Sequence, residues 1–240
     1  MEIKLFPRVE DINYEEIKGS NAIVIDILRA TSVIVTAMEN GAEKVIPVLS
    51  IDEAFDIKSK NSSVILGGER KGLKIEGFDM GNSPQEYARE QVEGKTIVIT
   101  TSNGTRAIRG SMEAKNIFIG SMLNGKAVAL DAAALDSIDK EADISIVCAG
   151  TLGKFSLDDF LCAGYIIDEI LKLKEYKLND ISFLAHYTYM NNKDNLHDFI
   201  KNVYHYRYLC SIGHKSNADY CFNRATTDIV PKFKNETITL

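Results

Sequence analysis

Short apolar runs, separated by polar segments that contain glycine, recur along most of the chain. Short runs bounded by turn residues are typical of buried strands, and helical spacing between them predicts the alternating order of an α/β protein. We therefore expect a three-layer α/β/α fold around a mostly parallel or mixed sheet. The predicted strands cover residues 22–27, 44–48, 64–67, 96–100, 117–120, 144–148 and 181–183.

Helix boundaries are marked by caps. One helix is expected to follow Thr31 and to end at Asn40-Gly41, because glycine readily takes the left-handed conformation of a C-cap. Residues 195–212 place apolar side chains at helical spacing, which predicts one amphipathic helix packed on the core. Three capping boxes, each a Ser followed three residues later by an acid, predict further helix starts at Ser50, Ser83 and Ser156.

Two segments share one order of strand, polar loop, helix and strand. They begin at residues 23 and 97, and their loops, 28–32 and 102–106, carry arginine and hydroxyl groups. In an open α/β sheet, loops at the carboxyl ends of the strands form the ligand site. This composition suits an anionic ligand. The likeness predicts a duplicated unit, so residues 1–240 are expected to be one domain, with two similar subdomains as the alternative.

Composition narrows the classes of protein. The 240 residues are 45% apolar and 26% charged, which is ordinary for a globular protein, and the net charge of −6 argues against a broad basic face for nucleic acid. No apolar run approaches the roughly 18 residues of a membrane span, and the N-terminus lacks the apolar region of a secretory signal. We expect a cytoplasmic protein without membrane or nucleic-acid partners, a homodimer as its assembly, and four buried, reduced cysteines.

Several familiar motifs fail on inspection. Residues 120–126 have the G-x-x-x-x-G-K frame of a phosphate-binding loop, but Ala127 stands where that loop needs Ser or Thr for Mg²⁺. Asn124 is then expected to be an ordinary helix N-cap. None of the four histidines has metal-ligand spacing, and Gly150-x-x-Gly153 lacks the third glycine of a dinucleotide fingerprint.

A long glycine-rich excursion covers residues 67–83. Loops of this length in a compact domain are usually functional or disordered. The apolar side chains of Leu73, Ile75, Phe78 and Met80 favour a segment that folds back onto the protein, although a solvated surface loop is the simpler alternative.

Acids, arginines and hydroxyls gather where the predicted strands end. Oxygen ligands without histidine suit Mg²⁺, and arginine forks match phosphate, sulfonate or carboxylate oxygens. Together they predict phosphoryl chemistry on a small polyanion. The set comprises Asp26, Arg29, Thr31, Ser32, Glu69, Arg70, Asp79, Ser102, Asn103, Thr105, Arg106, Asp158 and Asp159.

At these residues the chain resembles the 2-phosphosulfolactate phosphatase family, over nearly its whole length. The matching motifs are D-I-L-R-A-T-S from Asp26, G-G-E-R from Gly67, G-F-D-M-G-N-S-P from Gly77, T-S-N-G-T-R-A from Thr101, and C-A-G from Cys148. The resemblance implies Mg²⁺-dependent hydrolysis of 2-phospho-3-sulfolactate to 3-sulfolactate and phosphate, a step towards coenzyme M. One departure is Asp158, where the family pattern leads us to expect Glu before Asp159.

Asp26 is expected to be central, because it ends a buried strand at the loop edge, where it either ligates Mg²⁺ or attacks phosphorus. The alternative is an acid that only caps its own loop. Glu69 and Asp159 are predicted to complete the metal site, although Asp159 has a sufficient role in the Ser156 capping box. Arg29 and Arg70 join Asp26 as catalytic candidates. The predicted substrate-binding residues are Arg29, Thr31, Ser32, Arg70, Ser102, Asn103, Thr105 and Arg106.

A protein that only binds a small anionic metabolite is the alternative function. Arginines and hydroxyls are enough for it, whereas carboxylates in the same pocket repel an anion unless a cation lies between them. Acids converging on the pocket would therefore favour the enzyme, and a wholly basic pocket would favour the binding protein.

Overall fold

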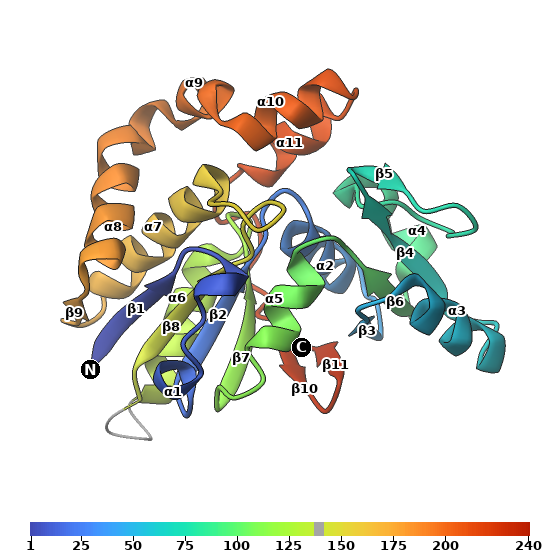
Figure 1. Ribbon diagram of the computed structural model, residues 1–240, viewed down its shortest axis with the longest axis horizontal. Helices are drawn as coiled ribbons and strands as arrows, with labels where there is room; N and C mark the ends of the chain where they lie inside the picture. Colours follow the sequence, from blue (N-terminus) through green and yellow to red (C-terminus); the bar gives the residue numbers. More distant parts are fainter. Residues whose placement is uncertain (137–141) are drawn as a thin grey trace.

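The computed structural model describes residues 1–136 and 142–240. Within this part of the chain, eleven strands form one mixed sheet with helices on both faces, a three-layer α/β/α arrangement (Figure 1). The strands are β1 (Glu2–Phe6), β2 (Asn21–Ile25), β3 (Lys44–Pro47), β4 (Ile65–Arg70), β5 (Leu73–Lys74), β6 (Thr96–Thr100), β7 (Asn116–Gly120), β8 (Ile144–Cys148), β9 (Lys177–Leu178), β10 (Lys232–Lys234) and β11 (Thr237–Thr239).

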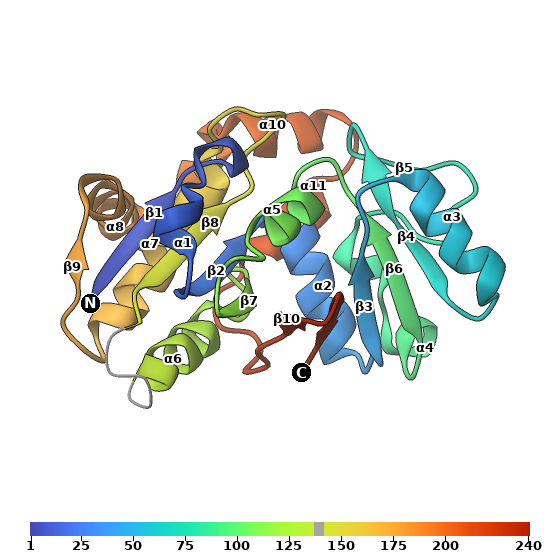
Figure 2. The same cartoon turned by 60° about the horizontal axis from the view of Figure 1, so that its bottom comes forward.

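The helices divide between the two ends of this sheet. In Figures 1 and 2, α6 to α8 accompany β1, β2 and β8, whereas α3 and α4 accompany β4 and β6. In Figure 1, α9 to α11 run over the top of the molecule. The helices are α1 (Tyr14–Ile17), α2 (Ala30–Glu39), α3 (Ile51–Lys60), α4 (Arg89–Val92), α5 (Gly104–Gly110), α6 (Gly125–Asp136), α7 (Leu157–Leu171), α8 (Asp180–Asn192), α9 (Leu196–Phe199), α10 (Tyr204–Ser211) and α11 (Lys215–Cys221), with 3₁₀ turns at Val9–Asp11, Pro84–Glu86, Lys193–Asn195 and Ile200–Asn202.

The sheet consists of two parallel halves joined by an antiparallel hairpin. One half has the order β9-β1-β8-β2-β7, and the other contains β3, β6 and β4. Strand β10 pairs antiparallel with β7, and β11 pairs antiparallel with β3. Phe233 and Ile238 of this hairpin are buried in the core that both halves share with α2 and α5. The C-terminal hairpin therefore makes one sheet of the two halves.

Six of the seven predicted strands are confirmed: residues 96–100 and 144–148 match β6 and β8 at both ends, and the ends of the other four differ by at most three residues. The prediction for residues 181–183 was wrong, because this segment lies in the first turn of α8. Asn179 caps that helix by accepting a hydrogen bond from the Ser182 N–H at 2.9 Å. The N-cap and the helical hydrogen bonds of the 13-residue α8 stabilise the helical conformation of this segment more than the strand tendency of three residues stabilises a strand.

The helix predictions fared unevenly. Helix α2 ends as expected, with Asn40 at the C-cap and Gly41 at φ 88°. The single helix predicted for residues 195–212 was wrong, because α9, a 3₁₀ turn and α10 divide the segment. Of the capping boxes, only that of Ser50 forms: its Oγ accepts the Glu53 N–H at 3.0 Å. Ser83 and Ser156 make no such cap.

The two segments that look alike in sequence occupy comparable places. The unit β2-α2-β3 crosses from one half of the sheet to the other, and β6-α5-β7 crosses back. In each, a threonine pins strand to helix: Thr31 Oγ1 accepts the Asp26 N–H at 3.1 Å, and Thr105 Oγ1 accepts the Thr101 N–H at 3.3 Å. Duplication remains a prediction, and this shared connectivity agrees with it.

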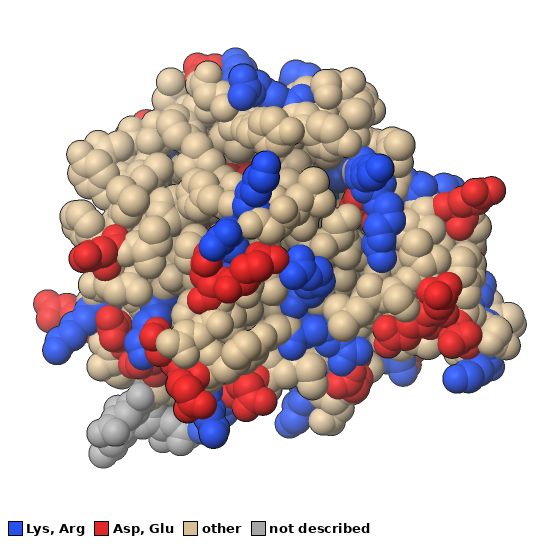
Figure 3. Space-filling model, in the orientation of Figure 1, with Lys and Arg blue, Asp and Glu red and all other residues tan. Residues whose placement is uncertain are grey.

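Other expectations concern side chains away from the sheet edge. Asn124 directly precedes α6, as expected for an N-cap, and its carbonyl accepts the Val128 N–H at 3.0 Å. Its side chain turns back into the preceding loop, where Oδ1 accepts the Ser121 N–H at 2.9 Å. All four cysteines are free thiols, and Cys210 is only half-buried. No helix in the described ranges is long and apolar enough to cross a bilayer. Figure 3 shows acidic and basic side chains interspersed over this face of the molecule.

Candidate active site

A pocket of about 250 Å³ lies where the two halves of the sheet meet, at the carboxyl ends of the strands. Helix α10 lies across this edge in both ribbon views (Figures 1 and 2). The loops after β2, β4, β6 and β8 form its floor and sides, and α10 contributes four side chains. The lining residues are Asp26, Leu28, Arg29, Glu69, Lys71, Gly72, Asn82, Ser102, Asn103, Thr151, Leu152, Tyr204, His205, Tyr208 and Leu209.

Asp26 follows β2 directly, and its side chain is 5% exposed. Its Oδ1 accepts a long hydrogen bond from the Ala30 N–H, at 3.4 Å. The first residues of α2 and α5 meet here: a Cβ on Gly104 would lie 2.7 Å from Asp26 Oδ2 and 2.5 Å from Ala30 Cβ. Glycine at this position therefore lets two helix starts close around one carboxylate.

The surroundings of Asp26 favour its protonated form. Burial is the main cause that raises the pKa of this carboxyl; the charge of His205 opposes it, repulsion from Glu69 and Asp158 adds to it, and the net pKa is about 7. An acid with such a pKa in a pocket is a functional candidate, because its charge state changes near neutral pH. A bound cation would favour the ionised form.

Glu69 holds the walls of the pocket together. Its Oε1 accepts the Ser102 N–H at 2.8 Å, and its Oε2 accepts the Gly72 N–H at 2.7 Å. The carboxylate thereby ties the loop after β6 to the turn between β4 and β5. With both oxygens engaged, Glu69 contributes negative charge and shape to the pocket, and one lone pair on each oxygen remains for a ligand.

Arg29 is buried beside Asp26 and lines the pocket. Its Nη1 donates to Ser83 Oγ at 3.1 Å and its Nη2 donates to the Gly72 carbonyl at 2.8 Å. These two bonds fix the plane of the guanidinium, so its charge is presented in one orientation. Lys71 adds a second cationic side chain to the same pocket.

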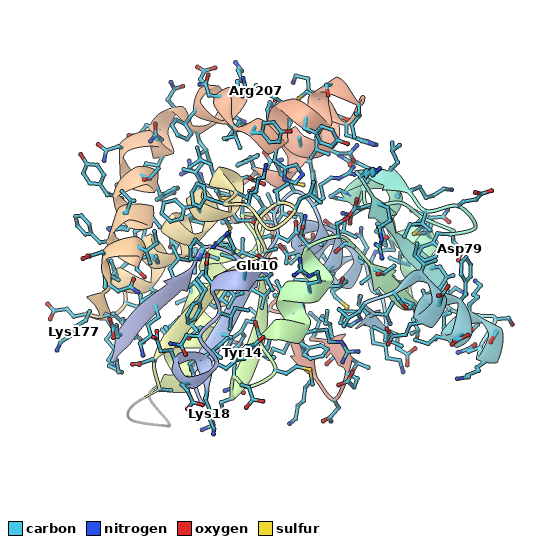
Figure 4. All side chains as sticks on the ribbon, in the orientation of Figure 1. Glu10, Tyr14, Lys18, Asp79, Lys177 and Arg207 are labelled. Carbon is cyan, nitrogen blue, oxygen red and sulfur yellow. The ribbon has the colours of Figure 1, made fainter. Side chains whose placement is uncertain are left out.

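Two predicted arginines lie elsewhere. Arg70 is the last residue of β4. Its guanidinium donates to the Glu69 carbonyl at 2.7 Å and to Thr100 Oγ1, on the neighbouring strand β6, at 3.1 Å. Arg106 is exposed and pairs with Glu10 at 2.9 Å, in front of the sheet where Figure 4 labels Glu10. Neither of these two side chains is among those that line the pocket.

Asp79 and Asp159 also have structural partners. Asp79 pairs with Lys58 at 3.1 Å on the outer side of the β4 half, where Figure 4 labels it. Asp159 Oδ1 accepts the Ile27 N–H and its Oδ2 accepts the Gly150 N–H, both at 3.0 Å. This buried carboxylate joins the loops after β2 and β8. Its role as a metal ligand stays a prediction, and its position favours a structural one.

The predicted hydroxyl and amide groups divide in the same way. Ser102 and Asn103 line the pocket, and Asn103 Oδ1 accepts the Leu152 N–H at 3.0 Å. Thr31, Ser32 and Thr105 are fully buried and bonded to nearby backbone: Ser32 Oγ donates to the Ile27 carbonyl at 2.9 Å. These three shape the loops that carry Asp26 and Asn103.

Sequence reasoning missed His205, and it left the role of Asp158 open. His205 Nδ1 lies 3.2 Å from Asp158 Oδ2 and 3.2 Å from Thr151 Oγ1. Burial lowers the pKa of this imidazole, but the charge and hydrogen bond of Asp158 raise it more, with help from Asp26, so the net shift is upward. The available signal was the run Y-H-Y-R-Y from Tyr204, which gives one helix three tyrosines and a histidine.

A second missed residue is Asn82, in the G-N-S-P motif. Its side chain is buried, and its Oδ1 has no hydrogen-bond partner in the described part of the chain. A buried amide oxygen without a donor is costly, and Asn82 is one of the residues that line the pocket with Asp26. A carboxylate and an amide oxygen are suitable Mg²⁺ ligands, because this ion usually keeps several waters and takes only one or two carboxylates.

This donor set differs from that of a transition-metal centre. Among the residues described, no three His, Cys, Asp or Glu side chains form a group that could hold a metal ion. Within the pocket lining, Asp26, Glu69 and Asn82 carry oxygen atoms of the kind that could hold Mg²⁺.

Comparison with known proteins gives one family by two routes. The profile of the family described as 2-phosphosulpholactate phosphatase matches residues 6–236, which include every segment that lines the pocket. A protein of Clostridium novyi (strain NT), named "Probable 2-phosphosulfolactate phosphatase", is 50% identical over 240 residues, 100% of both chains. Proteins with the same name from Clostridium tetani and Clostridium acetobutylicum are 50% and 47% identical, over 99% of this chain and 100% of theirs.

Proposed function

Because the chain belongs to the 2-phosphosulfolactate phosphatase family, we propose that it is a Mg²⁺-dependent phosphatase that converts 2-phospho-3-sulfolactate to 3-sulfolactate and phosphate. The observation that carries the proposal is a buried Asp26 in a pocket that also contains Arg29 and Lys71. A carboxylate that can hold a metal ion, beside two cationic side chains that attract an anionic substrate, suits metal-assisted hydrolysis of a phosphate ester. The same reaction would provide 3-sulfolactate for coenzyme M synthesis.

Mg²⁺, when bound by Asp26 and Asn82, would neutralise charge on the phosphoryl oxygens. The cationic side chains of Arg29 and Lys71 attract the phosphate, sulfonate and carboxylate of the substrate, and the fixed guanidinium orients one of them. Ser102 and Asn103, in the loop after β6, also line the pocket. Helix α10 lies across the pocket edge, and exclusion of water by a bound substrate there would strengthen each of these interactions.

The alternative, a protein that only binds a small anion, is less well supported by this pocket. Asp26 and Glu69 are both acids of the lining. Without a cation between them and the ligand, their charges would weaken anion binding, so a binding protein gains nothing from them.

Phosphate release tests the proposal directly. We expect Mg²⁺-dependent turnover of 2-phosphosulfolactate, slower turnover of phospholactate and phosphoglycolate, and little of a neutral aryl phosphate, because remote anionic groups hold the phosphoryl group in place. Asp26→Asn should lower kcat at least about 100-fold, a typical loss when one charge of such a site is removed. It should also weaken Mg²⁺ binding measured by calorimetry.

The matched control is Arg106→Gln, which removes a charge outside the pocket and should leave turnover within about twofold. Equal turnover of all four esters would contradict the preference for polyanions. A wild-type protein that binds 2-phosphosulfolactate but releases no phosphate would support the binding protein instead.

A further inference from the structure

His205 and Asp158 form a hydrogen-bonded pair at the α10 side of the pocket. The His205 side chain is 13% exposed, and that of Asp158 is 1% exposed. Asp158 is held in turn, since its Oδ1 accepts a short hydrogen bond from the Ser156 hydroxyl. One ring nitrogen of His205, Nδ1, faces Asp158 Oδ2 and Thr151 Oγ1.

This contact leaves the other nitrogen for the pocket. A carboxylate at Nδ1 fixes the ring orientation and favours a proton on that nitrogen. No residue of the described ranges is hydrogen-bonded to Nε2, and His205 itself lines the pocket. Arg207, two residues further along α10, instead lies at the outer side of the molecule (Figure 4). His205 lines the pocket together with Tyr204 and Tyr208 of α10, and of these three it is the side chain whose ordinary pKa lies near neutral pH.

We propose that His205 is the general acid of the reaction, and that Asp158 is its positioning residue. This inference rests on the proposed phosphatase function. The bond between phosphorus and the alcohol oxygen breaks, and its electron pair stays on that oxygen. The proton on His205 Nε2 moves to the oxygen, which leaves as the hydroxyl of 3-sulfolactate. Water supplies the new oxygen of phosphate, and one of its protons returns to the imidazole through solvent.

The position of the pair suits this step. Phosphoryl transfer places the attacking and leaving oxygens roughly in line, on opposite sides of phosphorus, and charge builds on the leaving oxygen. Asp26 belongs to the strand edge, whereas His205 belongs to the helix lying across it. A substrate between them has its phosphoryl group towards one wall and its ester oxygen towards the other. An alkyl alcohol is a poor leaving group, so a proton donor there contributes strongly.

The experiment compares two esters that differ in one atom. In the second, sulfur replaces the bridging ester oxygen of 2-phosphosulfolactate, and its thiolate can leave without a proton because thiols are far more acidic than alcohols. We expect His205→Asn to lower kcat on the oxygen ester by about 100- to 1000-fold, the usual range for a general acid, but on the sulfur ester by less than about fivefold.

Two further variants separate acid catalysis from a structural role. His205→Gln places an amide donor near the Nε2 position but cannot give up its proton, so we expect the same pattern with little change in KM. Asp158→Asn should lower kcat on the oxygen ester alone by about 10- to 100-fold, a typical effect of losing the carboxylate behind a functional histidine. Asp158→Glu keeps a carboxylate and introduces the residue that the family pattern leads us to expect. We expect its kcat on the oxygen ester to lie between those of Asp158→Asn and the wild type.

His197→Asn is the matched control, because His197 is exposed on α9 and outside the pocket. It should leave both esters unaffected, and circular dichroism should show that all variants fold. Equal losses on the two esters in both His205 variants would overturn the inference while the phosphatase function stands. A wild-type enzyme that cleaves neither ester would overturn the proposed function and this inference together.

Discussion

At the scale of single residues, Asp26 combines a functional position with a cost to stability. A carboxyl whose pKa is about 7 in the folded protein binds its proton more tightly there than in the unfolded chain. Its contribution to the free energy of unfolding is complete below the unfolded-state pKa. That contribution is lost as the pH rises through about 7, so the metal-free protein should be less stable at pH 8 than at pH 5 on account of this residue.

Asp26→Asn should abolish the decrease in stability that the wild type shows on account of Asp26 as the pH rises. In EDTA, the variant should gain stability relative to the wild type between pH 5 and pH 8, on the order of 2–3 kcal/mol, because an amide carries no charge to bury. Thermal unfolding at both pH values measures it. Asp228→Asn, at an exposed position, should show no such gain. If Asp26→Asn were equally destabilising at both pH values, the buried carboxyl would not have the raised pKa that its surroundings imply.

Arg29→Lys keeps a charge but loses the planar fork. Lysine cannot make both the Ser83 and the Gly72 bond from one plane, so its ammonium would present the charge less rigidly. We expect KM for 2-phosphosulfolactate to rise about tenfold or more, with a smaller change in kcat, in steady-state kinetics. Arg106→Lys, at the exposed pair with Glu10, should leave KM unchanged; a similar rise there would contradict a special role for Arg29.

The sequence was informative for residues whose position follows from their own strand. Asp26, Arg29, Glu69, Ser102 and Asn103 were found because a strand end in a parallel sheet has a known place. His205 lies on a helix about 180 residues after Asp26 in the chain. No local sequence pattern predicts that this helix packs over the edge of the sheet. The same limit applies to Arg106, which is near Asn103 in sequence but turns towards Glu10.

At the scale of elements, the starts of α2 and α5 meet at one point. Gly104→Ala would put a methyl group 2.5 Å from Ala30 Cβ and 2.7 Å from Asp26 Oδ2, too close to be accommodated without movement. We expect activity to fall at least about 10-fold, since small displacements of reacting groups are costly. Gly110→Ala, at the other end of α5, would meet the flexible end of Ile12 at 3.1 Å and Val9 Cγ1 at an ordinary 3.7 Å, so it should retain activity. Full activity in Gly104→Ala would show that the two helix starts can separate harmlessly.

Elements were predicted well where burial is continuous. The parallel strands that were predicted each contain a short apolar run, because helices cover both faces of the sheet. The short strands β5, β9, β10 and β11 have two or three residues each, so they carry little pattern of their own. Residues 195–212 kept their helical spacing but not one helix, because packing of short segments over the pocket edge breaks the axis without altering which side chains face inward.

At the scale of the whole molecule, the two halves of the sheet depend on the hairpin between them. Ile238 is fully buried and its strand pairs with β3 at Val45. Ile238→Ala should lower the free energy of unfolding by about 2–4 kcal/mol, as for other large core residues replaced by alanine. Leu240→Ala, at a side chain that is 66% exposed, should change it by less than about 0.5 kcal/mol in denaturant titrations. Equal changes in the free energy of unfolding for the two variants would mean that the hairpin contributes little to holding the two halves of the sheet together.

The position of that hairpin in the chain also sets an order of assembly. During synthesis, the ribosome delivers β2, β7, β3 and β6 long before β10 and β11, so the nascent protein carries two partial sheets whose facing edges stay unpaired until the final segment emerges. Unpaired strand edges are sites where other chains add on. The catalytic groups on both sides of the seam can therefore be brought into register only after translation of the hairpin, and the newborn chain is most in need of chaperone protection during that interval.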